Sequence, residues 1–510
     1  MTDYKEYYGA SGELPVLIAA DAAVKHAETY EKRERILSFL CMAVGFLFVR
    51  LCCYHVTGLL TTLLFCLITT MCILYLRRSG KTFGKSQKAL AGVLYAFSAV
   101  YTVTANHLLT FLNTLFLITV SALFVYALCQ TDSNTFHWLP LTMEKALFSH
   151  PFGSLNKCPA AALSAARSKS GWKNVLHVLV GLILTVPLTF IVAALLCSAD
   201  DAMAQMINNL IFEPDSETLI LIPQLAFGLL LGFYLFGMLY SNVHTPKPLL
   251  DEECERRILG MRIMPNAMVY AAVTPICILY VLFFVSQFPY FLGGFTGELA
   301  EGFTYAEYAR KGFFELCAVC CINFAVIGIM SFMAKQCGER KPIMLKIYTL
   351  FLSVCSLILA GTAIAKMFLY IRAYGMTQLR IYTSWFMLLL ITGFVLIILR
   401  QFKAKLPVCK IAFILFTAMF GLLCFSRPDA WMTRYNAEMY LSGQLEEFDY
   451  AHFSSLSDDA LVTAIAYKDV LDTSSIEWEL KDFESECSED FYQSLNLSAW
   501  LILANGGASE

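Results

Sequence analysis

The chain has 510 residues, of which 58% are hydrophobic and only 15% are charged, and its formal net charge is −3. Soluble domains carry about 25% charged residues. This composition therefore excludes an ordinary soluble protein, and the near-neutral charge gives no field for nucleic acid. We predict an all-α, multi-pass transmembrane helix bundle.

The apolar residues are grouped in long stretches along the chain. A membrane-spanning helix needs about 20 mostly apolar residues. Eleven stretches meet this requirement: 36–55, 57–76, 89–106, 108–129, 174–197, 218–241, 266–288, 313–334, 347–370, 381–399 and 408–426.

The distribution of lysine and arginine predicts the orientation of these spans. With a cytoplasmic N-terminus, the segments on the inner side hold 27 of the 37 lysines and arginines. Basic residues concentrate in cytoplasmic loops of membrane proteins. We therefore predict a cytoplasmic N-terminus and an extracytoplasmic C-terminus, and the lipid bilayer as the main partner.

The spans and loops give five predicted regions. The loop at 130–173 is interpreted as helices lying at the membrane interface, with a ligand-binding loop as the alternative. The regions are a cytoplasmic segment 1–35, transmembrane helices one to four at 36–129, the cytoplasmic loop 130–173, transmembrane helices five to eleven at 174–426, and an acidic helical extracytoplasmic tail at 427–510.

The tail is strongly acidic but has the pattern of a folded domain. Residues 429–510 contain 17 acidic residues against Arg434, Lys468 and Lys481, yet aromatic and aliphatic residues recur throughout. Ser457 is interpreted as a helix N-cap, with Asp458 and Asp459 in the first turn, where the helix dipole favours acids. We interpret the acidity as a source of solubility, with cation or partner binding as the alternative.

Charged residues within spans are rare here and predict a specific pair or a functional site. Glu315, in span eight, falls within about one turn of the outer boundary. Lys366 in span nine falls in the same layer. Further polar residues that reach or extend this outer-leaflet layer are Arg310, Tyr370, Arg372, Arg380 and the deeper Asn323.

Two interpretations of this layer stay open. The charges could pin spans eight, nine and ten together, because an uncompensated buried charge is costly. Alternatively, they line a cavity that binds an anionic headgroup or relays a proton. Asn323 either continues this polar face or makes a hydrogen bond between helices.

Asp200 and Asp201 form an acidic pair just outside span five. The sequence "SADD" suits the N-cap of a short surface helix. The alternative is a carboxylate pair that holds a metal and a base in a membrane-embedded glycosyl transferase.

Motifs for catalysis and metal binding are absent from the sequence. It has no G-x-x-x-x-G-K-[ST], no H-E-x-x-H and no G-x-S-x-G. The cysteines of "CAVCC" (317–321) lie in an apolar helix without a nearby histidine, so we predict no metal site there and no cofactor. These absences favour a non-enzymatic protein.

Several blocks of the chain resemble a known family. They are "LLCSADDAM" (195–203), "TYAEYARKGFFEL" (304–316), "YIRAYGMTQLRIYTSWFM" (370–387), "TRYNAEMYLSG" (433–443) and "FDYAHFSSLSDDAL" (448–461). In order and spacing they are similar to an uncharacterised bacterial multi-pass membrane family, domain of unknown function 4173. The resemblance implies a protein of the bacterial cytoplasmic membrane and supplies no catalytic residues.

Two hypotheses follow. The first is a non-enzymatic membrane protein with a transport, sensing or envelope-accessory role at the outer face, where the partner is an extracytoplasmic protein or an anionic lipid headgroup. The second is a membrane-embedded transferase that acts on a lipid-linked substrate through Asp200 and Asp201.

Overall fold

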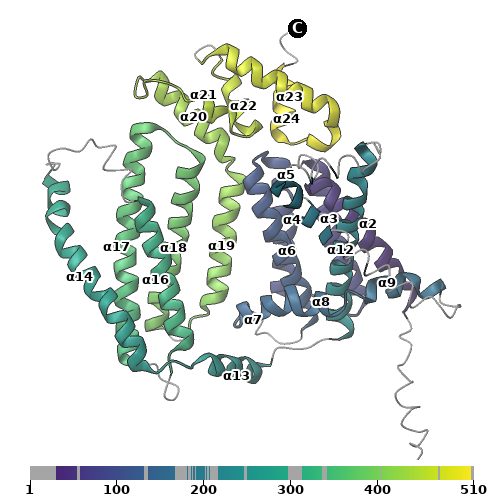
Figure 1. The fold of residues 1–510 in the computed structure, drawn as a ribbon, viewed down its shortest axis with the longest axis horizontal. Coiled ribbons are helices and arrows are strands. Elements are labelled where there is room, and N and C mark those ends of the chain that lie inside the picture. The colour runs from purple at the N-terminus through teal and green to yellow at the C-terminus, as the bar shows by residue number, and fades with distance from the viewer. Residues whose placement is uncertain are drawn as a thin grey trace, which may run out of the picture. The chain divides into compact units, whose positions relative to one another are not determined.

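The structure is a computed structural model (Figure 1). The residues that it describes are 30–53, 58–130, 136–166, 181, 185, 188–189, 191–193, 195–200, 203, 206, 216–245, 250–296, 313–335, 342–403, 405–468 and 471–506.

Helices make up the described residues almost entirely, as the long apolar stretches predict. No strand occurs among these residues, where a single bridge joins Met264 to Ala334. The α-helices are α2 (Lys32–Cys53), α3 (Leu59–Arg78), α4 (Lys85–Ser98), α5 (Val100–Val103), α6 (His107–Cys129), α7 (Leu139–Glu144), α8 (His150–Gly153), α9 (Lys157–Ala162), α12 (Ser216–His244), α13 (Asp251–Met261), α14 (Asn266–Thr296), α16 (Phe313–Met333), α17 (Ile343–Tyr374), α18 (Gln378–Phe402), α19 (Val408–Phe425), α20 (Pro428–Leu441), α21 (Tyr450–Ser454), α22 (Asp458–Ile465), α23 (Thr473–Ser494) and α24 (Leu497–Gly506).

Nine helices in the described part of the chain are long and apolar enough to cross a membrane: α2, α3, α6, α12, α14, α16, α17, α18 and α19. The predicted all-α, multi-pass membrane bundle is confirmed. Each of the nine corresponds to one of the eleven predicted spans.

The two other predicted spans, 174–197 and 89–106, are not among these nine helices. Most of 174–197 lies outside the described residues. The stretch 89–106 is built from α4, with 14 residues, and the single turn α5. It ends because Thr104 is extended and the Asn106 side chain accepts a hydrogen bond from the Leu109 N–H, which caps the next helix.

The chain divides into two compact units. The first comprises residues 1–46 and 154–237, and the second comprises 47–153 and 238–510. In the first unit, α2 and α12 pack backbone against backbone, because a Cβ on Gly45 would lie 2.2 Å from the Gly228 carbonyl oxygen. Small residues allow membrane helices this close approach.

The second unit contains the rest of the spans. Helices α14, α16, α17 and α18 share one apolar core, in which Phe313, Leu352 and Phe394 are almost fully buried. Helix α19 packs against α4 and α6 through stacked, tilted and edge-on ring pairs of Phe97, Phe116, Phe416 and Phe420. These ring contacts hold the early and late spans of this unit together.

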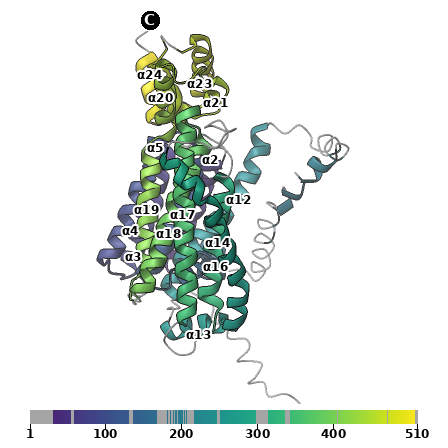
Figure 2. The same cartoon turned by 90° about the vertical axis from the view of Figure 1, so that its left-hand side faces the viewer.

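Helices α20 to α24 gather around a second, smaller core at one end of these spans (Figures 1 and 2). We call residues 428–506 the capping module and this end of the spans the capped end. The core of the module contains Phe448, Phe453, Leu461, Ile476 and Phe483.

A polar layer lies at the opposite end of the same unit, around α7, a π-helix (Lys145–Ser149) and α8. Trp138 Nε1 donates to Asp251 at 2.8 Å, and Lys145 pairs with Glu253 at 3.6 Å. Arg257 pairs with Glu144 at 3.7 Å. These contacts fix α13 to the π-helical segment.

Candidate functional site

The predicted charged layer is partly assembled at the capped end. Glu315 lies in the first turn of α16 and is exposed, whereas Lys366 on α17 is half-buried. The two charges interact electrostatically. Arg372 is exposed near the end of α17, and Arg310 lies outside the described residues.

Arg380 lies beside Tyr370 and the end of α17. Its guanidinium donates to the carbonyl oxygens of Tyr374, at 3.0 Å, and Gly375, at 2.5 Å. It also covers the Tyr370 ring at 4.1 Å from the centroid. Arg380 therefore binds the orphan carbonyls at the end of α17 and makes a cation–π contact with Tyr370.

Asn323 joins three membrane helices. It is 1% exposed, its Oδ1 accepts from the Tyr280 hydroxyl of α14 at 2.7 Å, and its Nδ2 donates to Ser356 Oγ of α17 at 2.8 Å. Asn323 thus makes the hydrogen bonds between helices that were one of its two predicted roles. Both polar ends of the side chain are satisfied, which removes the penalty of placing an amide in an apolar core.

Asp200 closes a turn of helix, since its N–H donates to the Leu196 carbonyl at 3.1 Å. The residue is exposed, and Asp201 lies outside the described residues. Within the described part of the chain, no group of three or more His, Cys, Asp or Glu side chains could hold a metal ion.

A second polar cluster, which the sequence did not single out, lies where the capping module meets the spans. Its centre is Asp459 in the first turn of α22, with 0% exposure. Asp459 accepts from Thr104 Oγ1 at 2.5 Å and from the Ala105 N–H at 3.3 Å, both between α5 and α6. It also pairs with Arg427 at 3.2 Å.

Arg427 connects α19 to α20 in a conformation that few residues adopt. It has φ +50° and precedes Pro428, the first residue of α20. Its guanidinium donates to Asp459 and to the hydroxyl of Ser498 in α24. A left-handed conformation costs a bulky residue about 1–3 kcal/mol, so it persists where surrounding contacts hold it.

Asp429 is the second buried carboxylate, again with 0% exposure. Its oxygens accept from Asn106 Nδ2 at 2.7 Å and from Gln378 Nε2 of α18 at 3.1 Å. They also accept from the N–H and hydroxyl of Ser457 at 3.2 and 2.7 Å. Asn106 donates in addition to the Tyr382 hydroxyl at 2.9 Å.

We call Asp429, Asp459 and these partners the carboxylate network. Both acids belong to the capping module, while their partners Thr104, Asn106 and Gln378 lie at the ends of membrane helices. Hydrogen bonds to a buried carboxylate are strong because the low local dielectric does not screen them. The network therefore fixes the module onto the spans.

The loop between α17 and α18 links the predicted charged layer to the module. Asn436 of α20 accepts from the Met376 N–H at 2.6 Å and donates to the Met376 carbonyl at 2.9 Å. Gly375 has φ +75° and ψ −175°, and a Cβ there would lie 2.6 Å from Asn436 Oδ1. Only glycine fits both the backbone conformation and the close approach.

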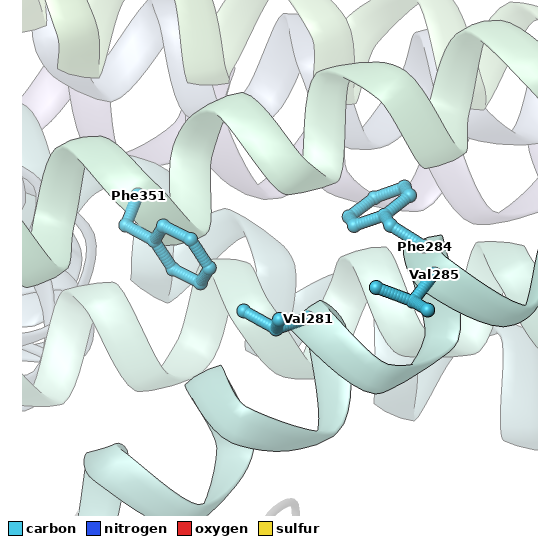
Figure 3. Close-up of a pocket in the computed structure, with 4 residues that line it drawn as sticks. All are labelled: Val281, Phe284, Val285 and Phe351. Carbon is cyan, nitrogen blue, oxygen red and sulfur yellow. The ribbon is translucent and has the colours of Figure 1, made fainter. Parts of the chain in front are cut away.

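An apolar crevice of about 380 Å³ opens between α14 and α17 (Figure 3). Its lining is Val281, Phe284, Val285 and Phe351. The crevice offers no donor, acceptor or charge for chemistry, so the polar contacts at the capped end are the better candidate for function.

A family model described as Domain of unknown function (DUF4153) matches residues 89–467 of the chain. Membership of a family of unknown function agrees with the predicted resemblance, whereas domain of unknown function 4173 itself is not matched. The matched region begins in α4 and ends just after α22, so it contains both buried aspartates. No curated protein and no solved structure matches the chain.

Proposed function

This chain belongs to the DUF4153 family, and on that premise we propose that it is a non-enzymatic sensing or accessory protein of the bacterial cell envelope. It is an integral membrane protein with several spans. In our proposal the capping module faces the outside of the cytoplasmic membrane, meets a partner there, and passes the effect to the spans.

One observation carries this proposal. Two carboxylates with 0% exposure, both from the module, make hydrogen bonds to the α5–α6 junction and to the start of α18. Burying a charge is costly unless every lone pair is satisfied. A contact that only tethered the module to the spans would not need two buried acids. A joint through these two acids would transmit displacement of the module to the membrane helices α6 and α18.

The charged layer is the proposed binding surface for the partner. Lys366, Arg372 and Arg380 lie along the end of α17 and the start of α18, and the Gly375–Met376 loop between these helices is held by Asn436 of the module. An anionic lipid headgroup or an acidic protein segment that binds these bases would therefore act next to the module.

Sensing is better supported than transport. The Tyr280–Asn323–Ser356 hydrogen bonds inside the spans satisfy one another, and the crevice between α14 and α17 is apolar. Ion or solute pathways are instead lined by polar groups that face water.

The orientation is the first test. Alkaline phosphatase fused after Glu510 should be active, and green fluorescent protein fused there should be dark, because the tail is predicted to be outside. An active fluorescent fusion together with an inactive phosphatase would place the module in the cytoplasm and overturn the proposal.

The second test is complementation of a deletion strain. We expect the deletion to sensitise cells to agents that damage the envelope. Wild-type protein and Asp200→Asn should restore resistance, whereas Lys366→Gln should restore it poorly at equal membrane abundance. Loss of rescue with Asp200→Asn, but full rescue with Lys366→Gln, would favour the transferase hypothesis instead.

A further inference from the structure

Two tryptophans of the capping module are unusually exposed for their size. Trp431 of α20 is 51% exposed and Trp500 of α24 is 59% exposed. Burying a tryptophan removes a large apolar area from water, so an isolated soluble module would be expected to cover at least one of them. The positions of the two tryptophans relative to the membrane helices indicate what covers these side chains.

Both tryptophans lie at the level where the membrane helices end. Trp431 is one turn into α20, which begins at Pro428 directly after the α19 span. Trp500 is one turn into α24, and Leu495, two residues before α24 begins, accepts from the N–H of Leu59, the first residue of the α3 span. The hydrogen bond from Arg427 to Ser498 ties the two helix starts together.

The direction of the side chains places the indole rings closer still to the bilayer. In an α-helix each Cα–Cβ bond tilts toward the N-terminus. The N-termini of α20 and α24 are the ends nearest the spans, since α20 follows α19 and α24 begins two residues after Leu495, which contacts Leu59. The rings of Trp431 and Trp500 therefore lean back toward the membrane.

Helix α24 has the surface of an interfacial helix. Leu497, Trp500 and Leu503 recur at a spacing of three and are exposed, while Ala499 and Ile502 face the core of the module. The sequence of α24, LSAWLILANG, contains no charged residue, within a tail that has 17 acids.

Trp478 provides the contrast within the same module. It is 64% exposed on α23, but it stands between Glu477 and Glu479. Carboxylates beside an indole are unfavourable at an apolar surface, so this tryptophan belongs in water.

We propose that Trp431 and the Leu497–Trp500–Leu503 face of α24 bind the headgroup layer of the bilayer at the capped end. The apolar body of each indole enters the interface and its N–H meets headgroup oxygens, which is why tryptophan concentrates at membrane boundaries. This lipid contact seats the module on the membrane and is independent of the sensing role.

Tryptophan emission in nanodiscs of phosphatidylcholine tests the proposal. The full chain is compared with its Trp500→Phe, Trp431→Phe and Trp478→Phe variants, using lipids brominated at shallow or deep acyl positions and aqueous iodide as quenchers. Trp500→Phe and Trp431→Phe should each remove emission that shallow bromines quench more than deep ones. Trp478→Phe should remove emission that iodide quenches.

Two results would overturn the proposal. In the first, Trp500→Phe and Trp431→Phe remove only emission that iodide quenches, as Trp478→Phe does, which would leave the face in water. In the second, the emission of Trp500 is protected from both quenchers and the protection disappears when nanodiscs with a single copy are isolated. A second copy of the chain would then be the occupant.

Discussion

The capped end contains two groups of ionisable residues that differ in how completely they are bonded. Glu315 is exposed and interacts with the half-buried Lys366 through charge. Asp429 and Asp459 are both 0% exposed and each accepts several hydrogen bonds. Glu315, which lies in an apolar span, is thus less buried than Asp429 and Asp459. These two acids of the polar tail are the ones that make structural contacts.

The energy that holds the capping module to the spans is expected to come from the buried acids. An exposed ion pair contributes about 0–1 kcal/mol, because solvent screens it and side-chain entropy opposes it. Removing one partner of a buried pair costs about 3–5 kcal/mol, because the other partner keeps its desolvation penalty. The module should therefore depend on Asp429 and Asp459 far more than on Glu315.

The largest expected effect is at Asp459. Asp459→Ala leaves Arg427, Thr104 and Ser498 without their shared acceptor, and we expect it to lower the free energy of unfolding by about 3–5 kcal/mol. Thermal unfolding in detergent measures this loss. The matched control is Glu447→Ala, an exposed acid of the same module, where we expect at most about 1 kcal/mol. Equal losses for the two variants would remove the distinction between buried and solvated acids.

The next effect is at the loop between α17 and α18. Gly375→Ala forces a side chain into a backbone region that is almost exclusive to glycine and brings its Cβ to 2.6 Å from Asn436 Oδ1. We expect a loss of about 1–3 kcal/mol in the same assay.

Gly80→Ala separates the two causes of that loss. Gly80 also has a positive φ, +77°, but a Cβ added there would meet no other atom within 4 Å. The control should therefore lose only about 1 kcal/mol, from backbone strain. A larger loss at Gly80 than at Gly375 would show that the contact with Asn436 contributes little.

A smaller effect should depend on pH through His452 of α21. Burial lowers the pKa of His452, and Arg380 lowers it further, while Asp449 and Asp429 oppose the shift. The folded pKa lies below the unfolded value of about 6.5, so the unfolded chain binds more protons as the pH falls. Stability should be complete above about pH 6.5 and decline toward the folded pKa.

Unfolding of wild type and His452→Gln between pH 7.5 and pH 5 measures this contribution. The variant should lose less stability than wild type over this range, because it lacks the group that takes up the proton. Identical pH profiles for the two proteins would show that His452 does not couple the module to pH.

The smallest effect is expected at Glu315. Glu315→Gln should lower thermal stability in detergent by less than about 1 kcal/mol, because the carboxylate is exposed. Glu315→Lys combined with Lys366→Glu should partly restore what either single change loses. No recovery in the double variant would mean that the two charges do not pair directly.

The spans and their helical class could be predicted from the sequence, because long apolar stretches admit one solution in a membrane. The same reasoning identified Lys366, Arg380 and Asn323 as contact-forming residues, since polar side chains in spans are rare. Lys366 interacts with Glu315 and Asn323 with Ser356, whereas Arg380 bonds to the carbonyls at the end of α17, so a joint cluster of these residues stays a prediction.

The carboxylate network could not be predicted in the same way. Asp459 follows another aspartate at a helix start, where dipole and solvation explain an acid without any buried partner. Thr104 is 355 residues away from Asp459 in the sequence, and no local pattern predicts their hydrogen bond. Asp429 lies beside Pro428 at a helix start, which is again an ordinary place for an exposed acid.

Ser457 shows how the network overrides a local rule. It occupies the N-cap position of α22, as the sequence predicts, but its side chain makes no cap hydrogen bond. Its hydroxyl donates to Asp429 instead, at 2.7 Å. The Asp429 side chain thus competes successfully with the local capping arrangement as the acceptor for this hydroxyl.

Buried acids, Asp429 and Asp459, fix the capping module to the spans. A double-mutant cycle with Asn106→Ala at the α5–α6 junction and Asp429→Ala in α20 tests this claim most directly, because the cycle cancels the N-cap that Asn106 also provides. The structure predicts a coupling energy above about 1 kcal/mol, since the two side chains bond at 2.7 Å. Effects that add within about 0.5 kcal/mol would contradict the claim.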